Sequence, residues 1–141
     1  MRQRLLLGLA LALAACGRST PPAAPAPPPA KSLQVNEPGA LVDVEATLAG
    51  DHVTVVDFWA ESCGACSIVG GMLAVGVAKD VRVVIRKVDV GDGDTPVAHH
   101  YKVGALPHYR IYDRHKRLRY MLTGNDCTQA SALARALADE R

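Results

Sequence analysis

The sequence predicts an α/β fold in which a central mixed β-sheet is flanked by helices on both faces. Two observations lead to this prediction. Through about residue 102, runs of β-branched and aromatic residues alternate with helix-like segments, whereas near the end two strand-like runs flank a short polar turn. Alternating strands and helices favour parallel pairing, and a short turn between strands favours antiparallel pairing. The sheet is therefore expected to contain both.

The first half of this pattern contains two strands and two helices. Residues 33–35 form a candidate short strand, and Leu41, Val44 and Leu48 indicate a short helix that ends near Gly50. The run 53–60 is rich in β-branched and aromatic residues and predicts a buried strand. A helix is expected after it. Its proposed apolar positions are Ile68, Met72, Leu73, Val75 and Val77, and Gly70, Gly71 and Gly76 predict a kink or tight packing.

The second half begins with an apolar strand over residues 81–90. Thr95 and Pro96 then start a helix that runs to about residue 102. Residues 109–112 and 118–123 form the expected hairpin, and residues 124–126 cap a last helix. The apolar face of this helix is expected to contain Ala130, Leu133, Ala134, Leu137 and Ala138.

The N-terminus has the pattern of a secretory signal peptide. Arg2 and Arg4 precede a short apolar run, which is followed by small residues. The segment Leu13-Ala14-Ala15-Cys16 resembles the bacterial lipobox, which implies cleavage before Cys16 and attachment of lipid to its sulfur. The alternative is an ordinary signal peptide with an incidental cysteine. We therefore expect a signal peptide over residues 1–15 and membrane attachment through Cys16.

A spacer rich in proline and alanine separates this predicted anchor from the rest of the chain. Residues 16–32 have almost nothing to bury and favour an extended polyproline conformation, so they are expected to form a tether. Residues 33–141 have globular composition and form one domain. The predicted location is the bacterial cell envelope, facing the periplasm. Gly17 weakly favours the outer membrane, because lipoproteins kept in the inner membrane often carry Asp after the cysteine.

The charge balance gives no reason to expect a nucleic-acid partner. Loss of residues 1–15 would reduce Lys+Arg from 16 to 14, which equals the number of Asp+Glu residues. The mature side-chain charge is then close to zero, so the whole-chain charge of +2 says nothing in favour of nucleic-acid binding, and no nucleic-acid partner is expected.

Two cysteines, Cys63 and Cys66, lie where the strand 53–60 gives way to the next helix. Residues three apart share one face of a helix. The first cysteine would lie over the unpaired N–H groups and the positive dipole end of that helix. This setting favours the thiolate, which is the reactive form of cysteine. Thiol–disulfide exchange is therefore the leading hypothesis.

The domain resembles the thioredoxin family. The matching segments are Val56-Asp57-Phe58-Trp59-Ala60, Cys63-Gly64-Ala65-Cys66, Lys87-Val88-Asp89-Val90 and Tyr101-Lys102-Val103-Gly104-Ala105-Leu106-Pro107, in the family's order and with its spacing. The resemblance implies the thioredoxin fold, no cofactor, and activity as a monomeric disulfide oxidoreductase. Its partners would be protein thiols and disulfides and an upstream thiol donor.

The resemblance also implies roles for individual residues. Cys63 would attack the substrate disulfide and Cys66 would resolve the mixed disulfide. Pro107 occupies the cis-proline position and would present the backbone of Leu106 as an edge for the substrate chain. The predicted substrate surface further includes Trp59, Gly64, Ala65 and His108, and Trp59 is expected to support the loop rather than take part in the chemistry.

Asp57 is predicted to move the proton of Cys66, because a carboxylate within an apolar strand has a raised pKa and the family has an acid beneath its cysteines. The alternative is that Asp57 reaches solvent or caps a turn. The family has a lysine near this acid, and Lys87 matches its position. The sequence leaves open whether Lys87 or the adjacent Arg86 points towards Asp57.

Several positions depart from the family pattern. Ser62 and Ala65 stand where thioredoxins have tryptophan and proline, so the reduction potential, and with it the direction of electron flow, is left open. His108 either stabilises a thiolate as a cation or faces solvent. Cys127 is either a lone, partly buried thiol or a partner in a mixed or intermolecular disulfide.

A second class of function remains open from the sequence. A thioredoxin-fold lipoprotein could serve as a binding module or carry copper, because Cys63, Cys66 and His108 offer soft ligands. A structural zinc site is disfavoured, because it requires four ligands and the sequence has no second Cys/His pair with suitable spacing.

Overall fold

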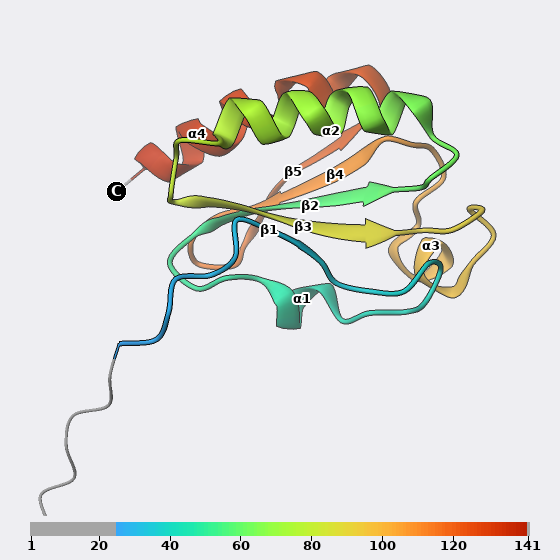
Figure 1. Cartoon of the computed structure of the whole chain (residues 1–141), viewed down its shortest axis with the longest axis horizontal. Helices are drawn as coiled ribbons and strands as arrows, with labels where there is room; N and C mark the ends of the chain where they lie inside the picture. Colours follow the sequence, from blue (N-terminus) through green and yellow to red (C-terminus); the bar gives the residue numbers. More distant parts are fainter. Residues whose placement is uncertain (1–24, 141) are drawn as a thin grey trace, which may run out of the picture.

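A five-stranded sheet forms the centre of the computed structural model, which describes residues 25–140 (Figure 1). The predicted signal peptide and Cys16 lie outside the described residues. The strands run in the order β1-β3-β2-β4-β5, with β1, β3 and β2 parallel and β4 and β5 antiparallel to their neighbours. Their bounds are β1 Ser32–Gln34, β2 Val53–Trp59, β3 Val83–Asp89, β4 His108–Tyr112 and β5 Leu118–Thr123. The mixed sheet is as predicted.

Helices cover both faces of this sheet (Figure 1). Their bounds are α1 Val44–Thr47, α2 Gly64–Val77, α3 Pro96–Tyr101 and α4 Ala130–Asp139. α2 and α4 lie side by side on one face, and α1 and α3 cover the other. This arrangement confirms the predicted α/β fold with helices on both faces. Among residues 25–140, no helix is long and apolar enough to cross a membrane.

Strand β2 is the central element and is buried on both sides. Six of its seven residues are buried. Alternation places Val53 and Val55 in the core under α2 and α4, and Val56 and Phe58 in the core under α1 and α3. Asp57 follows the same alternation and therefore points towards α2, which decides what it can contact.

Helix α2 begins at Gly64, and Cys63 before it is the N-cap. Its buried face consists of Cys66, Val69, Leu73 and Val77, so two of the predicted apolar positions are confirmed. The other three apolar positions face solvent instead: the exposed fractions are 69% for Ile68, 50% for Met72 and 80% for Val75. Hydrophobicity alone could not set the buried face, because α2 is apolar nearly all round.

The glycines of α2 allow close approach, and the segment remains one continuous helix. A Cβ added at Gly76 would lie 2.5 Å from Cβ of Ser131 in α4. Contacts that short are essentially forbidden, so the missing side chain lets α2 and α4 pack tightly. Of the two outcomes expected from the sequence, tight packing is therefore the one observed.

The last helix begins later than predicted. A 3₁₀ helix, η1 (Gly124–Gln129), occupies the segment that was expected to cap it, and α4 then starts at Ala130. Its predicted inner face is confirmed, because Ala130, Ala134 and Leu137 are buried. The strand predicted over residues 81–90 is shorter, since residue 82 still belongs to a turn in which Arg82 pairs with Asp80.

Candidate active site

Cys63 and Cys66 form a disulfide at the N-terminus of α2, with their Cα atoms 5.2 Å apart. The Sγ of Cys63 accepts a hydrogen bond from the backbone N–H of Cys66 at 3.1 Å. Cys63 is partly exposed, whereas Cys66 is 3% exposed. Gly64 and Ala65 between them are exposed. A macromolecular substrate can therefore reach Cys63 but not Cys66.

A cavity of about 270 Å³ lies behind Cys66. Asp57, Trp59, Cys66, Gly70 and Lys87 are among the residues that line it. Asp57 is 3% exposed, and its Oδ1 has no hydrogen-bond partner among residues 25–140. Burial raises the pKa of Asp57 to about 7, although the charge of Lys87 opposes the shift. A carboxyl with this pKa exchanges protons readily near neutral pH.

Lys87, rather than Arg86, shares the face of Asp57. Lys87 lies directly opposite Asp57 in the pairing of β2 with β3. Its Nζ lies 4.1 Å from the centre of the Trp59 ring, and the Trp59 indole N–H donates to the side chain of Gln34. Arg86 points to the other face, where it donates to the carbonyl of Thr47. Trp59 thus holds the lysine at the rim of the cavity.

Pro107 lies at the end of the sheet where β2 stops, because the next residue, His108, pairs with Phe58. The Leu106–Pro107 peptide bond is cis. The carbonyl of Pro107 accepts a hydrogen bond from the Gly124 N–H at 2.8 Å and contacts the Sγ of Cys127 at 3.5 Å. Within residues 25–140, Leu106 makes no backbone hydrogen bond. Its backbone groups are therefore free to pair with another chain.

His108 is buried, so the interpretation as a solvent-facing residue was wrong. Its Nδ1 lies 3.1 Å from Oγ1 of Thr123, and its ring packs edge-on against Phe58. Burial and the nearby charge of Arg110 lower the pKa of His108. The imidazole is therefore neutral at pH 7 and supplies no positive charge to a thiolate there. Its place in the substrate surface stays a prediction.

Cys127 is a free thiol that is 1% exposed. Burial raises its pKa to about 11, so it is neither accessible nor ionised near neutral pH. These properties fit the interpretation as a lone buried thiol and not a partner in an intermolecular disulfide. In the described part of the chain, no cluster of three or more His, Cys, Asp or Glu side chains is placed to hold a metal.

Sequence reasoning missed two residues that lie close to Asp57. Tyr109 pairs directly with Asp57 across β2 and β4, and Gly70 of α2 faces both side chains. The alternation of β4 was visible in the sequence. The register that brings Tyr109 opposite Asp57 was not, because it depends on where the loop before Pro107 returns to the sheet.

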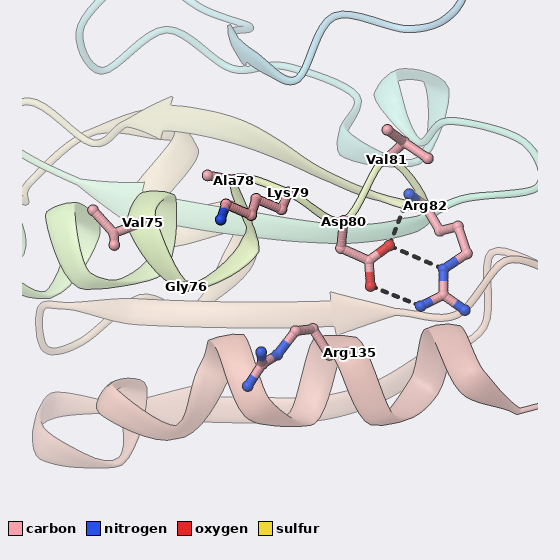
Figure 2. Close-up of a pocket in the computed structure, with 8 residues that line it drawn as sticks. All are labelled: Val75, Gly76, Ala78, Lys79, Asp80, Val81, Arg82 and Arg135. Atoms are coloured by element: carbon pink, nitrogen blue, oxygen red, sulfur yellow. Dashed lines mark hydrogen bonds and ion pairs between the residues drawn. The ribbon is translucent and has the colours of Figure 1, made fainter.

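A larger cavity of about 770 Å³ lies at the other end of α2, away from the thiols. Figure 2 shows its lining, in which the Asp80 carboxylate pairs with Arg82 and Arg135 extends from α4. The residues around it carry no thiol or imidazole. The redox chemistry therefore belongs to the smaller cavity behind Cys66.

Comparison with known proteins identifies the family. A family model described as Thioredoxin matches residues 42–139. The chain belongs to the thioredoxin family. The thioredoxin of Mycoplasma pneumoniae is 31% identical over 91 residues, covering 62% of this chain and 88% of that protein. The thioredoxin of Gallus gallus is 34% identical over 87 residues, covering 60% and 82%.

Solved thioredoxin structures share the fold. A mutant thioredoxin from Halobacterium salinarum superposes with a TM-score of 0.60 at 20% identity, covering 79% of this chain and 94% of that one. The thioredoxin of Malassezia sympodialis gives 0.55 at 25% identity, covering 67% and 85%. The family and the Cys63–Cys66 disulfide together make the protein a thiol–disulfide oxidoreductase, acting on protein thiols and disulfides with a reductant. The predicted fold and enzyme class are confirmed.

Proposed function

We propose that this thioredoxin-family member reduces or isomerises protein disulfides in the bacterial cell envelope, anchored to a membrane by lipid on Cys16. The observation that carries the chemistry is the asymmetry of the two cysteines. Cys63 is partly exposed at the start of α2, and Cys66 is buried against the cavity that contains Asp57. An upstream dithiol keeps the pair reduced.

The first step is attack by Cys63. When the pair is reduced, the N-terminal end of α2 stabilises the Cys63 thiolate. The thiolate attacks one sulfur of the substrate disulfide, forms a mixed disulfide with it, and releases the other substrate sulfur as a thiolate, which takes up a proton from water.

The second step is release by Cys66. Asp57 accepts the proton of the Cys66 thiol, and the resulting thiolate attacks Sγ of Cys63. The bond between Cys63 and the substrate breaks, the second substrate sulfur leaves as a thiolate that takes up a proton from water, and the Cys63–Cys66 disulfide forms. Two electrons have then passed to the substrate, and the proton on Asp57 leaves through the cavity.

The substrate chain is held next to the cysteines by the free backbone of Leu106. Cys63 and Leu106 both pack, partly buried, against the core under α1 and α3. A substrate segment that pairs with the backbone of Leu106 lies extended beside it, and main-chain hydrogen bonds then position its disulfide next to Cys63.

Support for an anchored arrangement comes from where the tether enters the domain. The ammonium of Lys31 donates to the carbonyls of Asp80 and Val83, at 2.6 Å each. Asp80 lies in the turn before β3 and Val83 starts β3, whereas Cys63 follows the end of the parallel strand β2. The tether and the thiols are therefore at opposite ends of the sheet (Figure 1), so an anchored domain would present Cys63 away from its attachment point.

Reduction of insulin by a thiol donor tests the activity. We expect the protein to accelerate the precipitation of reduced insulin, and Cys63→Ser to abolish this. Cys66→Ser should instead trap a mixed disulfide with insulin, visible on a non-reducing gel. A wild-type rate equal to that of Cys63→Ser contradicts the proposal.

Metabolic labelling with palmitate tests the anchor. The protein expressed in a bacterial host should incorporate label and fractionate with membranes, whereas Cys16→Ala should do neither. Cys127→Ala is the matched control, because it removes a cysteine that lies inside the fold. Release of unlabelled wild-type protein into the soluble periplasmic fraction contradicts the anchor.

A further inference from the structure

Tyr109 and Asp57 form a buried polar pair across the sheet. They lie directly opposite each other in the antiparallel pairing of β2 with β4, so their side chains share the face under α2. Tyr109 is 0% exposed and Asp57 3% exposed. Within residues 25–140, neither Oη of Tyr109 nor Oδ1 of Asp57 has a hydrogen-bond partner. Unpaired buried polar atoms are uncommon and call for an explanation.

The oxygens of both side chains face Gly70 of α2, which has no side chain of its own to fill the space beside them. A Cβ at this position would lie 3.6 Å from Oδ2 of Asp57 and 3.9 Å from Oη of Tyr109. Both oxygens therefore border the same small gap under α2, and Gly70 also lines the cavity behind Cys66. An ordered water in this gap could form hydrogen bonds to the Asp57 carboxylate and to the Tyr109 hydroxyl.

Four other groups face Asp57 from the surrounding elements. Lys87 approaches from β3 and lowers the pKa of the carboxyl. Cys66 of α2 borders the same cavity. Cys127 of η1 lies near enough for the charge of Asp57 to raise its pKa, and Tyr109 responds in the same way. Among these groups, the Tyr109 hydroxyl is a neutral O–H donor that does not ionise near neutral pH.

We propose that Tyr109 is a positioning residue for the proton transfer, whose hydroxyl donates to the Asp57 carboxylate through a water held next to Gly70. The inference rests on the proposed proton-accepting role of Asp57. Tyr109 does not take the proton itself. It orients the carboxylate and stabilises its charged form, which is the form that accepts a proton from Cys66.

The consequence is a predictable shift in the titration of Asp57. Loss of a hydrogen bond to a charged group disfavours that charge, and for a carboxylate this raises the pKa. The usual strength of such a bond corresponds to a shift of about one pH unit. Tyr109→Phe should therefore move the Asp57 titration up by about one unit, and it should move the acid limb of the insulin-reduction rate upwards to match.

The test is a carbon-13 NMR titration of the Asp57 carboxyl in the oxidised full chain, kept soluble in mild detergent. Oxidation removes the titrations of Cys63 and Cys66, so the midpoint reports on the surroundings of Asp57 alone. Tyr112→Phe is the matched control, because this buried tyrosine of β4 packs on the opposite face of the sheet and its change should leave the midpoint in place.

A second pair of variants tests the gap without touching the tyrosine. Gly70→Ala places a methyl group at ordinary contact distance from both oxygens, whereas the methyl of Gly71→Ala, at the next residue, meets nothing within 4 Å. Gly70→Ala should raise the Asp57 midpoint, as Tyr109→Phe does. The shift in the double variant should be close to that of either single variant, because both changes remove the same bridge. Gly71→Ala should have no effect. An unmoved midpoint in Gly70→Ala overturns the water-bridged pair, which keeps the inference open to test if Tyr109→Phe fails to fold.

A midpoint that stays in place or falls in folded Tyr109→Phe overturns the inference, as does a rate lowered equally at every pH. The two proposals fail separately. A raised midpoint in a protein that does not reduce insulin overturns the proposed function but keeps the Tyr109–Asp57 pair. An unmoved midpoint in an active protein overturns only the role of Tyr109.

Discussion

Asp57 serves the chemistry at the expense of stability. It lies on the central strand, on the face that Val53 and Val55 bury in the core, and burial holds its pKa near 7. An apolar side chain at this position would avoid the free-energy cost of burying a polar group. The functional value of the acid at this position comes from the cavity that Asp57 and Cys66 both line, which allows proton transfer between them.

This cost appears as a dependence of stability on pH. The pKa of Asp57 is about 7 in the folded protein against 3.8 ordinarily, so between these values the folded state holds a proton that the unfolded chain has released. The free energy of unfolding should therefore fall as pH rises from about 4 to 7. Relative to Asp57→Asn, the oxidised wild type should lose about 4 kcal/mol over this range. Urea unfolding at several pH values measures it, and parallel curves for the two proteins contradict it.

At the same scale, the sequence predicted Cys63, Cys66, Asp57, Lys87 and Pro107 because each lies within a local motif. Tyr109 lies two positions beyond such a motif and looks like an ordinary core residue. Its proximity to Asp57 depends on the strand register, and its relevance depends on the missing side chain at position 70. Neither is visible until distant segments are placed together.

For helix α2, too, the sequence predicted the element but not its contacts with the rest of the fold. Its existence and its start at Cys63 followed from local chemistry, but its buried face did not, because apolar residues occur on nearly every side. The strands were easier to predict, since β2 and β3 are buried on both faces and need only continuous apolar character. The 3₁₀ helix η1 was missed because its residues are also good helix caps and turn formers.

Two neighbouring residues of α2 test this assignment of faces. Leu73 is 2% exposed and belongs to the core, so Leu73→Ala should lower the free energy of unfolding by about 2–5 kcal/mol. Met72 is half exposed, so Met72→Ala should change it by less than about 1 kcal/mol. Chemical denaturation of both variants measures the difference, and equal losses would show that the helix is rotated relative to the sheet.

The contact between α2 and α4 gives a second prediction at this scale. Gly76→Ala should lower the free energy of unfolding by about 1–3 kcal/mol, because the added methyl meets Ser131 at 2.5 Å and forces the helices apart. Alanine is otherwise the better helix former by about 1 kcal/mol. Gly71→Ala, which meets nothing, should therefore stabilise the protein. A stabilising Gly76→Ala would contradict the tight packing, and thermal melts of the two variants distinguish the cases.

For the whole molecule, the N-terminal part of the domain connects the tether to the site. Lys31 fixes the chain at the far end of the sheet, β1 runs along the edge of β3, and Gln34 then bonds to Trp59 beside the cavity. The short strand was predicted, but the sequence placed the start of the domain at residue 33. Lys31 contributes two hydrogen bonds before that point.

Removing this segment should affect both stability and association. A chain that begins at Asn36 loses the Lys31 bonds, the pairing of Ser32–Gln34 with Ile85–Lys87, and the support of Trp59. We expect its free energy of unfolding to fall by about 3 kcal/mol or more. Because β3 then becomes an exposed edge strand, the shortened chain should also self-associate.

A chain that begins at residue 30 keeps every one of these contacts and serves as the control. Urea unfolding and size-exclusion chromatography measure the two effects. If both chains unfold alike and remain monomeric, β1 is dispensable and residues up to 35 belong to the tether rather than to the domain.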